Sequence, residues 1–315
     1  MTLPPRTRSD VVDIARAVAL VAMFAYHLVW DLADYGFLPP GTPFTPPMRL
    51  ASNAIAVTFL ALVGVSLVMA DRGGRRSGAF WKRCALIAAA AGLTSAVTLV
   101  VEPQAPIVFG ILHCIALASL LAAPLLRIPA GAACAIGLSA LLAPRVFSAP
   151  AFDAPLVQWI GLGLHEPATL DWRPLLPWAG FVWLTLGLAR LLPSRFWQSR
   201  PMVWRARARL MSALTWLGRH SLAIYLTHQP VLFAGLFVAS AALGLGASRE
   251  RDAFLAACRP ACVESGGAIE LCERSCVCVA DKAMRATLGA QLLAKIWPDT
   301  HPTQSAAESC AVEAR

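Results

Sequence analysis

The feature that most constrains this chain is the recurrence of apolar segments long enough to cross a lipid bilayer. A transmembrane helix needs about 20 mainly apolar residues to span a hydrocarbon core of about 30 Å. Seven segments reach or approach that length, at residues 11–32, 48–70, 80–100, 107–126, 130–144, 175–192 and 217–245. Only 14% of the residues are charged, whereas soluble domains average about 25%. The sequence therefore predicts an all-α membrane protein, a polytopic bundle of about seven transmembrane helices with a small cysteine-rich helical C-terminal tail.

The distribution of lysine and arginine predicts the orientation of these segments. Short cytoplasmic loops of membrane proteins carry an excess of both residues. With the N-terminus in the cytoplasm, sixteen basic residues fall on the cytoplasmic side, and only Arg49, Arg145 and Arg173 fall outside. The segment at 130–144 is the shortest, and without it the C-terminus would move to the cytoplasmic side. We therefore predict a cytoplasmic N-terminus and a C-terminal tail on the outer face.

The net charge of +9 raises the question of an anionic partner. Most of the basic residues belong to the topological pattern, so we do not expect nucleic acid as a partner. Membrane lipid with anionic headgroups, or a phosphorylated cofactor, fits such cytoplasmic cations better.

The tail becomes charged and cysteine-rich from about residue 247. Cys258 and Cys262 form one C-x3-C pair and Cys272 and Cys276 form another, and each pair shares one face of a helix. Two antiparallel helices could then be joined by nested bridges, Cys258 to Cys276 and Cys262 to Cys272. A metal site and unpaired thiols remain as alternatives, although the outer face is an oxidising environment that favours disulfides.

Ionisable residues inside apolar segments are candidates for function, because a charge in hydrocarbon costs at least a few kcal/mol. His27 and Asp31 lie four residues apart in the first segment, so they share one helix face. A carboxylate one turn from an imidazole can fix its tautomer, which a general base requires. The alternative is that Asp31 faces interfacial water and His27 makes only a packing contact.

Three further polar residues lie in other apolar segments. His113 and Asn53 fall toward the predicted outer side of the membrane, and His228 falls nearer the middle. Histidines from three helices could therefore line one cavity, with Asn53 or His113 orienting an acceptor or holding an oxyanion. The alternative is that each histidine makes an ordinary interhelical hydrogen bond.

The cytoplasmic end of the first segment carries both acidic and basic residues. Asp13 and Arg16 are three residues apart, which suits a local ion pair. Alternatively, Arg16 faces inward to bind an anionic cofactor, with Arg76 and Arg83 supplying further positive charge. The positive-inside rule alone would also explain those two arginines. The sequence has no Walker loop, dinucleotide fingerprint or zincin motif, and we predict no metal site.

Three stretches of the chain resemble one known family. They are RSDVVDIARAVALVAMFAYHLVWD at 8–31, FGILHCIALASL at 109–120 and LGRHSLAIYLTHQPV at 217–231. Together they are similar to the bacterial heparan-alpha-glucosaminide N-acetyltransferase catalytic-domain family, whose usual opening is R-x-D-x-x-R-G-x-A followed by methionine and histidine. Ala17 stands where the family usually has glycine after the arginine, a change that should affect packing more than chemistry.

This resemblance implies an acyltransferase of the bacterial inner membrane that takes acetyl-CoA, or another acyl-CoA, from the cytoplasm. The acyl group would pass to an amine or hydroxyl of an envelope glycan on the periplasmic side. His27, oriented by Asp31, would act as base, with His228 as a further catalytic candidate. The expected domains are a transmembrane acyltransferase-like domain at 1–246 and a periplasmic cysteine-rich tail at 247–315.

Two other classes of function are compatible with the sequence. The same membrane histidines and aspartates could relay protons in a proton-coupled transporter. The chain could also be a non-catalytic membrane scaffold that presents its cysteine-rich tail to an envelope partner.

Overall fold

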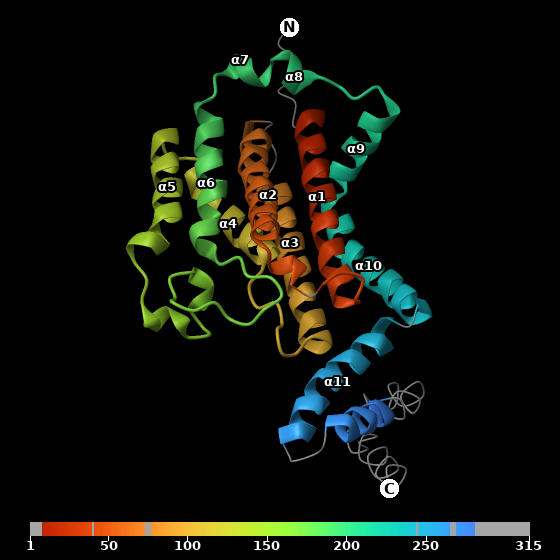
Figure 1. The fold of residues 1–315 in the computed structure, drawn as a ribbon. Helices are drawn as coiled ribbons and strands as arrows, with labels where there is room; N and C mark the ends of the chain where they lie inside the picture. The colour runs from red at the N-terminus through yellow and green to blue at the C-terminus, as the bar shows by residue number, and fades with distance from the viewer. Residues whose placement is uncertain (1–7, 40, 73–76, 244, 265–268, 281–315) are drawn as a thin grey trace. The chain divides into compact units, whose positions relative to one another are not determined.

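All seven apolar segments form helices in the computed structural model (Figure 1). The structure describes residues 8–39, 41–72, 77–243, 245–264 and 269–280, and these residues contain no β-strand. The seven helices are α1 (Asp10–Asp34), α2 (Pro46–Arg72), α3 (Ser77–Val101), α4 (Ile111–Leu125), α5 (Ala130–Val146), α6 (Leu175–Leu191) and α10 (Ser221–Leu243). The predicted all-α fold class is therefore confirmed.

The length of the helices supports fewer membrane spans than the sequence predicts. Among the helices that the structure describes, only α1, α2, α3 and α10 are long and apolar enough to cross a bilayer by themselves. The apolar helices α4, α5 and α6 have 15, 17 and 17 residues. The first of these begins four residues later than predicted, because residues 102–110 form an irregular connection that contains two prolines. The lengths of the helices therefore do not confirm seven membrane-spanning helices.

Several shorter elements lie between the apolar helices or follow them. They are η1 (Thr42–Phe44), η2 (Pro150–Asp153), η3 (Gln158–Ile160), α7 (Ser194–Trp197), α8 (Arg200–Val203), α9 (Arg209–Arg219) and α11 (Leu245–Glu264), with a further helical segment at 269–280.

The single helix predicted for residues 217–245 is interrupted. The helix α9 ends at its C-cap residue His220. The backbone N–H of His220 donates hydrogen bonds to the carbonyls of Trp216 and Leu217. A new helix, α10, starts at Ser221. The predicted boundary was wrong because the apolar pattern continues across this cap.

The chain forms two compact units. The first contains Met1–Leu28 and Phe44–Val231, and the second contains Val29–Pro43 and Leu232–Arg315. Both α1 and α10 therefore contribute residues to each unit.

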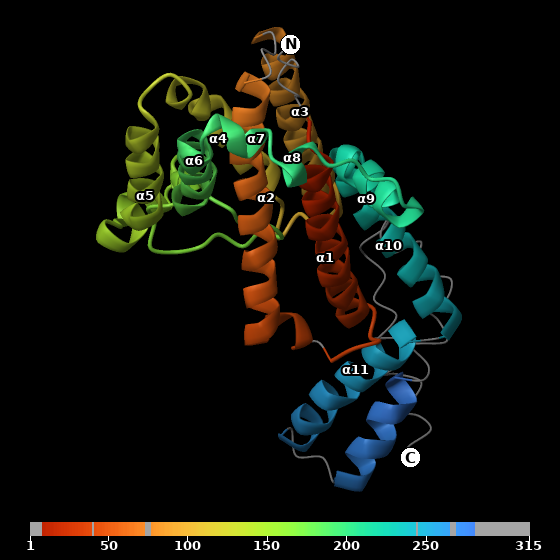
Figure 2. The same cartoon turned by 90° about the horizontal axis from the view of Figure 1, so that it is seen from above.

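The first unit is built around α6. This helix packs against α5, α2 and α4, and both views show it between α5 and α2 (Figures 1 and 2). Its buried face carries Val182, Trp183 and Leu186, and the Trp183 indole N–H donates to the Ala118 carbonyl at 3.0 Å. Gly64 allows the backbones of α2 and α6 to approach closely, because a side chain there would collide with the Val182 carbonyl.

Contacts at the helix ends show that α6 runs parallel to α2 and α4 and antiparallel to α5. At one end, the Arg190 guanidinium at the end of α6 donates to the carbonyls of Leu125 and Ile128 at 2.7 and 2.6 Å. At the other end, Arg173 before α6 donates to Ser52 near the start of α2 at 2.6 Å. In Figure 1 the connection at 147–174 lies opposite the end that holds α7 and α8. These relative directions agree with the alternation that the arginine pattern predicts, and the side of the membrane on which each end lies stays a prediction.

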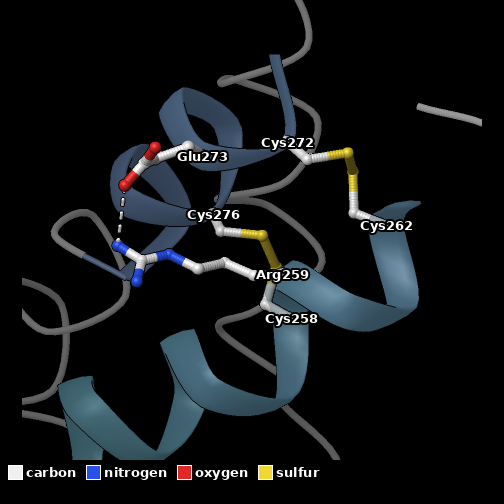
Figure 3. Close-up of a disulfide and its surroundings, with 6 residues drawn as sticks. All are labelled: Cys258, Arg259, Cys262, Cys272, Glu273 and Cys276. Atoms are coloured by element: carbon white, nitrogen blue, oxygen red, sulfur yellow. Dashed lines mark ion pairs between the residues drawn. A yellow bond between two sulfur atoms is a disulfide. The ribbon is translucent and has the colours of Figure 1, made fainter. Parts of the chain in front are cut away.

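The cysteine-rich part of the second unit is a helical hairpin joined by two disulfides (Figure 3). The bridges are Cys258–Cys276 and Cys262–Cys272, the nested pairing predicted from the spacing. A disulfide that closes a loop of this length contributes about 3 kcal/mol by restricting the unfolded chain. Cys278 is also disulfide-bonded, and Cys310 lies outside the described residues.

The rest of the hairpin contact is small. Leu255 and Ala280 are buried beside Cys276. An ion pair between Arg259 and Glu273, 3.2 Å apart, lies on the hairpin surface (Figure 3). The two disulfides and this small apolar core together join the two helices.

Candidate functional site

Two of the predicted histidines meet inside the first unit. The rings of His27 on α1 and His228 on α10 lie 5.1 Å apart between centroids. Phe24, one turn before His27, packs against His228 at 4.7 Å. Residues 201 positions apart in the sequence therefore form one polar pair among apolar helices.

The hydrogen bonds of His228 define its tautomer. Its Nδ1 lies 2.6 Å from the carbonyl oxygen of Tyr225, and a carbonyl can only accept, so Nδ1 carries the proton. The opposite nitrogen, Nε2, is buried and has no hydrogen-bond partner among the described residues. His228 thus presents an unprotonated ring nitrogen, the form that can accept a proton from a substrate.

Asp31 lies one helical turn beyond His27 on α1 and belongs to the second unit. Its side chain is buried, with 2% of its surface exposed. A carboxylate is rarely buried without a specific role or partner. Its predicted pairing with His27 remains a prediction.

His113 occupies a different, fully bonded position. The Gly110 N–H donates to its Nδ1 at 3.2 Å, so the proton must lie on Nε2, which is 3.2 Å from the Ser95 hydroxyl oxygen. Ser95 in turn donates to the Ile107 carbonyl at 2.6 Å. Both ring nitrogens are therefore used to hold the connection between α3 and α4. This arrangement matches the structural alternative considered for His113.

Asn53 lies on an exposed face of α2. Its neighbour Ser52 makes the contact with the connection at 147–174, by accepting from Arg173. Adjacent residues of a helix point in directions about 100° apart around its axis. The sequence pattern alone did not show that Ser52, and not Asn53, faces this connection.

The connection before α6 brings charged residues that sequence reasoning did not select. The Asp171 carboxylate accepts from the Ile111 N–H at 2.7 Å and so caps the start of α4. The Arg173 guanidinium lies over the Trp178 ring, 4.6 Å from its centroid. Gly110 leaves room for Asp171, since a Cβ there would collide with the carboxylate. The sequence signal was weak, because a lone aspartate in a long loop has no periodicity.

Asp171 predicts a dependence of stability on pH. Burial raises the pKa of this carboxyl above 3.8, against the opposing effects of Arg173 and the Ile111 N–H. Between pH 3.8 and the native pKa, the folded protein binds more protons than the unfolded chain, so stability falls as pH rises through this range. We expect Asp171→Asn, which keeps an acceptor oxygen, to remove that fall in detergent melting curves measured from pH 4 to 7. An unchanged pH profile would contradict this account.

A second polar cluster lies at the opposite end of the first unit. The buried Asp10 pairs with Arg205 at 2.5 Å and Arg219 at 2.9 Å, and it also accepts from the Ala206 N–H at 3.0 Å. Asp13 pairs with Arg219 at 3.2 Å. These bonds attach the start of α1 to the segment before α9 and to the last residue of α9.

Arg16 belongs to the same cluster. Its guanidinium pairs with Asp13 at 2.6 Å, which confirms the predicted local ion pair, and donates to the Ser66 hydroxyl at 2.6 Å. Arg83 is half-buried on α3, and Arg76 lies outside the described residues. A role for these arginines toward a cofactor remains a prediction. Three guanidiniums and two carboxylates leave this cluster with one excess positive charge.

A hollow of about 450 Å³ adjoins this cluster. Its lining residues are Val203, Trp204, Arg205, Arg207 and Ala208. All five lining residues are exposed. Two guanidiniums beside an indole ring form a surface suited to a phosphorylated aromatic group.

The long apolar helices indicate an integral membrane protein. The contact between His27 and His228 places a polar site among these helices. The family model described as "Heparan-alpha-glucosaminide N-acetyltransferase, catalytic" matches residues 8–230, more than two thirds of the chain. The chain belongs to this family. Comparison with curated proteins and with solved structures found no match. Family and membrane helices together support a membrane acetyltransferase.

Proposed function

We propose that this protein moves an acetyl or acyl group from cytoplasmic acyl-CoA to an amine or hydroxyl of an envelope glycan on the periplasmic side of the bacterial inner membrane. The observation that carries this proposal is the contact between His27 and His228. Each histidine comes from a different part of the matched region, and each lies on a helix apolar enough to span a membrane.

The two histidines suit the proton transfer that acyl transfer requires. In the proposed reaction, the acceptor nitrogen or oxygen attacks the thioester carbonyl and gives its proton to His27, oriented by Asp31. The carbon–sulfur bond then breaks, and coenzyme A leaves as the thiol with that proton. His228, with Nε2 unprotonated, would hold the acceptor or share the proton. Asn53 is proposed to contact the acceptor, and His113 to position the loop before α4.

The arginine cluster supports entry of the donor from the cytoplasmic end. The hollow lined by Trp204, Arg205 and Arg207 would take the nucleotide phosphates, with Arg16, Arg76 and Arg83 adding positive charge. Arg16 and His27 are separated by eleven residues of α1, or about 16 Å along the helix axis. An extended pantetheine arm would carry the thioester from the arginines to the histidines.

The exposed Arg207 provides a test of donor binding. We expect Arg207→Gln to weaken coenzyme A binding by about tenfold, since a hydrogen bond to a charged group is worth about 1.5 kcal/mol or more. Isothermal titration of the purified protein measures the effect. Arg145→Gln, at the opposite end of the bundle, is the matched control and should leave affinity unchanged. Equal affinities for wild type and Arg207→Gln would exclude this donor site.

Release of coenzyme A by the purified protein tests the function itself. The proposal requires acetyl-CoA turnover that depends on an added amino-sugar acceptor. A proton-coupled transporter would instead show pH-dependent flux into proteoliposomes without binding coenzyme A. For a scaffold, deletion of residues 249–315 would abolish function, whereas an enzyme should retain acyl transfer in its 8–235 core.

A further inference from the structure

The segment that joins α6 to α9 combines arginines with aromatic residues. Residues 194–209 contain five arginines, three aromatic residues and no acidic residue. Phe196, Val203 and Trp204 expose between 37 and 41% of their surface, although they are large and apolar. Arginine interleaved with tryptophan and phenylalanine is typical of a segment that lies in the membrane interface.

An open apolar cavity of about 440 Å³ is partly lined by this segment. α7 and α8 cover it with Phe196, Trp197 and Met202, and the other walls come from α1, α2 and α6. Thr185 is its one polar lining residue, and its hydroxyl donates to the Phe181 carbonyl at 2.7 Å. The cavity therefore offers hydrocarbon contacts along its length.

The rim of the cavity is cationic. The Arg72 guanidinium at the end of α2 lies over the Trp197 ring, 5.4 Å from its centroid, and a guanidinium stacked in this way can still donate to an anion from its edge. Arg195 and Arg200 are exposed on α7 and α8, beside the lining residues. The Trp197 indole N–H is buried and has no acceptor in the part of the chain that the structure describes. A phosphate or ester oxygen would satisfy that donor.

We propose that this cavity binds one anionic phospholipid of the cytoplasmic leaflet, with an acyl chain between α2 and α6 and the phosphate at Arg72. Hydrocarbon walls below a cationic rim complement a lipid that is apolar at one end and anionic at the other. Basic pockets at the cytoplasmic ends of membrane helices are a known location for such headgroups. The donor hollow at Arg205 and Arg207 has separate lining residues, so this lipid site does not depend on the proposed function.

The test is native mass spectrometry of the purified full-length protein titrated with phosphatidylglycerol or phosphatidylcholine. We expect wild type to bind phosphatidylglycerol more tightly. Arg72→Gln combined with Arg195→Gln should weaken that binding by about 25-fold, because each cation near an anionic lipid contributes about fivefold. Leu188→Trp, which places a larger side chain on the cavity wall, should weaken both lipids while keeping the preference between them.

Arg127→Gln is the control, since Arg127 is exposed at the turn between α4 and α5. It should leave both affinities unchanged. Equal binding of the two lipids by wild type would overturn the proposal. A loss in Arg127→Gln as large as in the rim variant would also overturn it, because binding would then reflect general surface charge. Displacement of phosphatidylglycerol by palmitoyl-CoA would assign the cavity to the acyl donor instead.

Discussion

Replacing His27 by alanine is expected to lower kcat for acetyl transfer by about 10²–10⁴-fold, the usual contribution of a general base. His27 is partly exposed in the structure, whereas His228 is buried. Its ring packs against His228 and Tyr26, at 5.1 and 5.6 Å between centroids. Release of coenzyme A in the presence of acceptor measures the effect.

His220→Gln is the matched control for this prediction. His220 belongs to the same matched region but is exposed, and its Nδ1 contacts the Trp216 carbonyl at 2.9 Å. Its substitution should leave kcat within about twofold, a negligible change beside the effect of a general base. If His27→Ala also stayed within that range, the assignment of His27 as base would be wrong, and His228→Gln would test whether the other ring serves instead.

Gly218→Val is expected to cost about 3 kcal/mol in the free energy of unfolding, at the upper end of overpacking effects. A Cβ at Gly218 would collide with the backbone carbonyl of Asp13, and backbone atoms cannot move aside as a side chain can. The collision would also displace Arg219 from Asp10 and Asp13, which breaks part of the charge cluster. Thermal unfolding in detergent measures the loss.

Gly92→Val provides the same substitution where space is available. Apart from its chain neighbours and the backbone of its own helix, no atom of the described residues lies within 4 Å of a Cβ at Gly92 on α3. The change in stability there should stay within about 0.5 kcal/mol, as for other exposed helix positions. Equal losses of unfolding free energy in the Gly218→Val and Gly92→Val variants would show that α9 and α1 are not tightly packed at Gly218.

The helices and the disulfides were predictable because each depends on local spacing. A long run of apolar residues is enough to predict a membrane helix. The two C-x3-C pairs allow only a few ways of pairing the cysteines of two antiparallel helices. The pairs Cys258–Cys276 and Cys262–Cys272 are those that two antiparallel helices allow, although the spacing also left a metal site and unpaired thiols open. By contrast, the break at His220 depends on a capping bond within an apolar run that shows no gap.

Contacts across long sequence separations were only partly predictable. The meeting of His27 and His228 could be predicted, because polar residues in apolar helices gather away from lipid. His113 was expected in the same cavity, yet its bonds to Gly110 and Ser95 depend on loop geometry that no pattern encodes. The pairing of Asp10 with Arg205 likewise depends on how the irregular segment before α9 folds back on α1.

Acetyl transfer across a bilayer is the central claim, and sided proteoliposomes test it most directly. Labelled acetyl-CoA is supplied to the face that carries Arg205 and Arg207, and an amino sugar is supplied only to the other compartment. The account predicts acetylated sugar in the acceptor compartment, an equal amount of coenzyme A on the donor side, and neither product with His27→Ala. Product that forms only when both substrates share one compartment would contradict it.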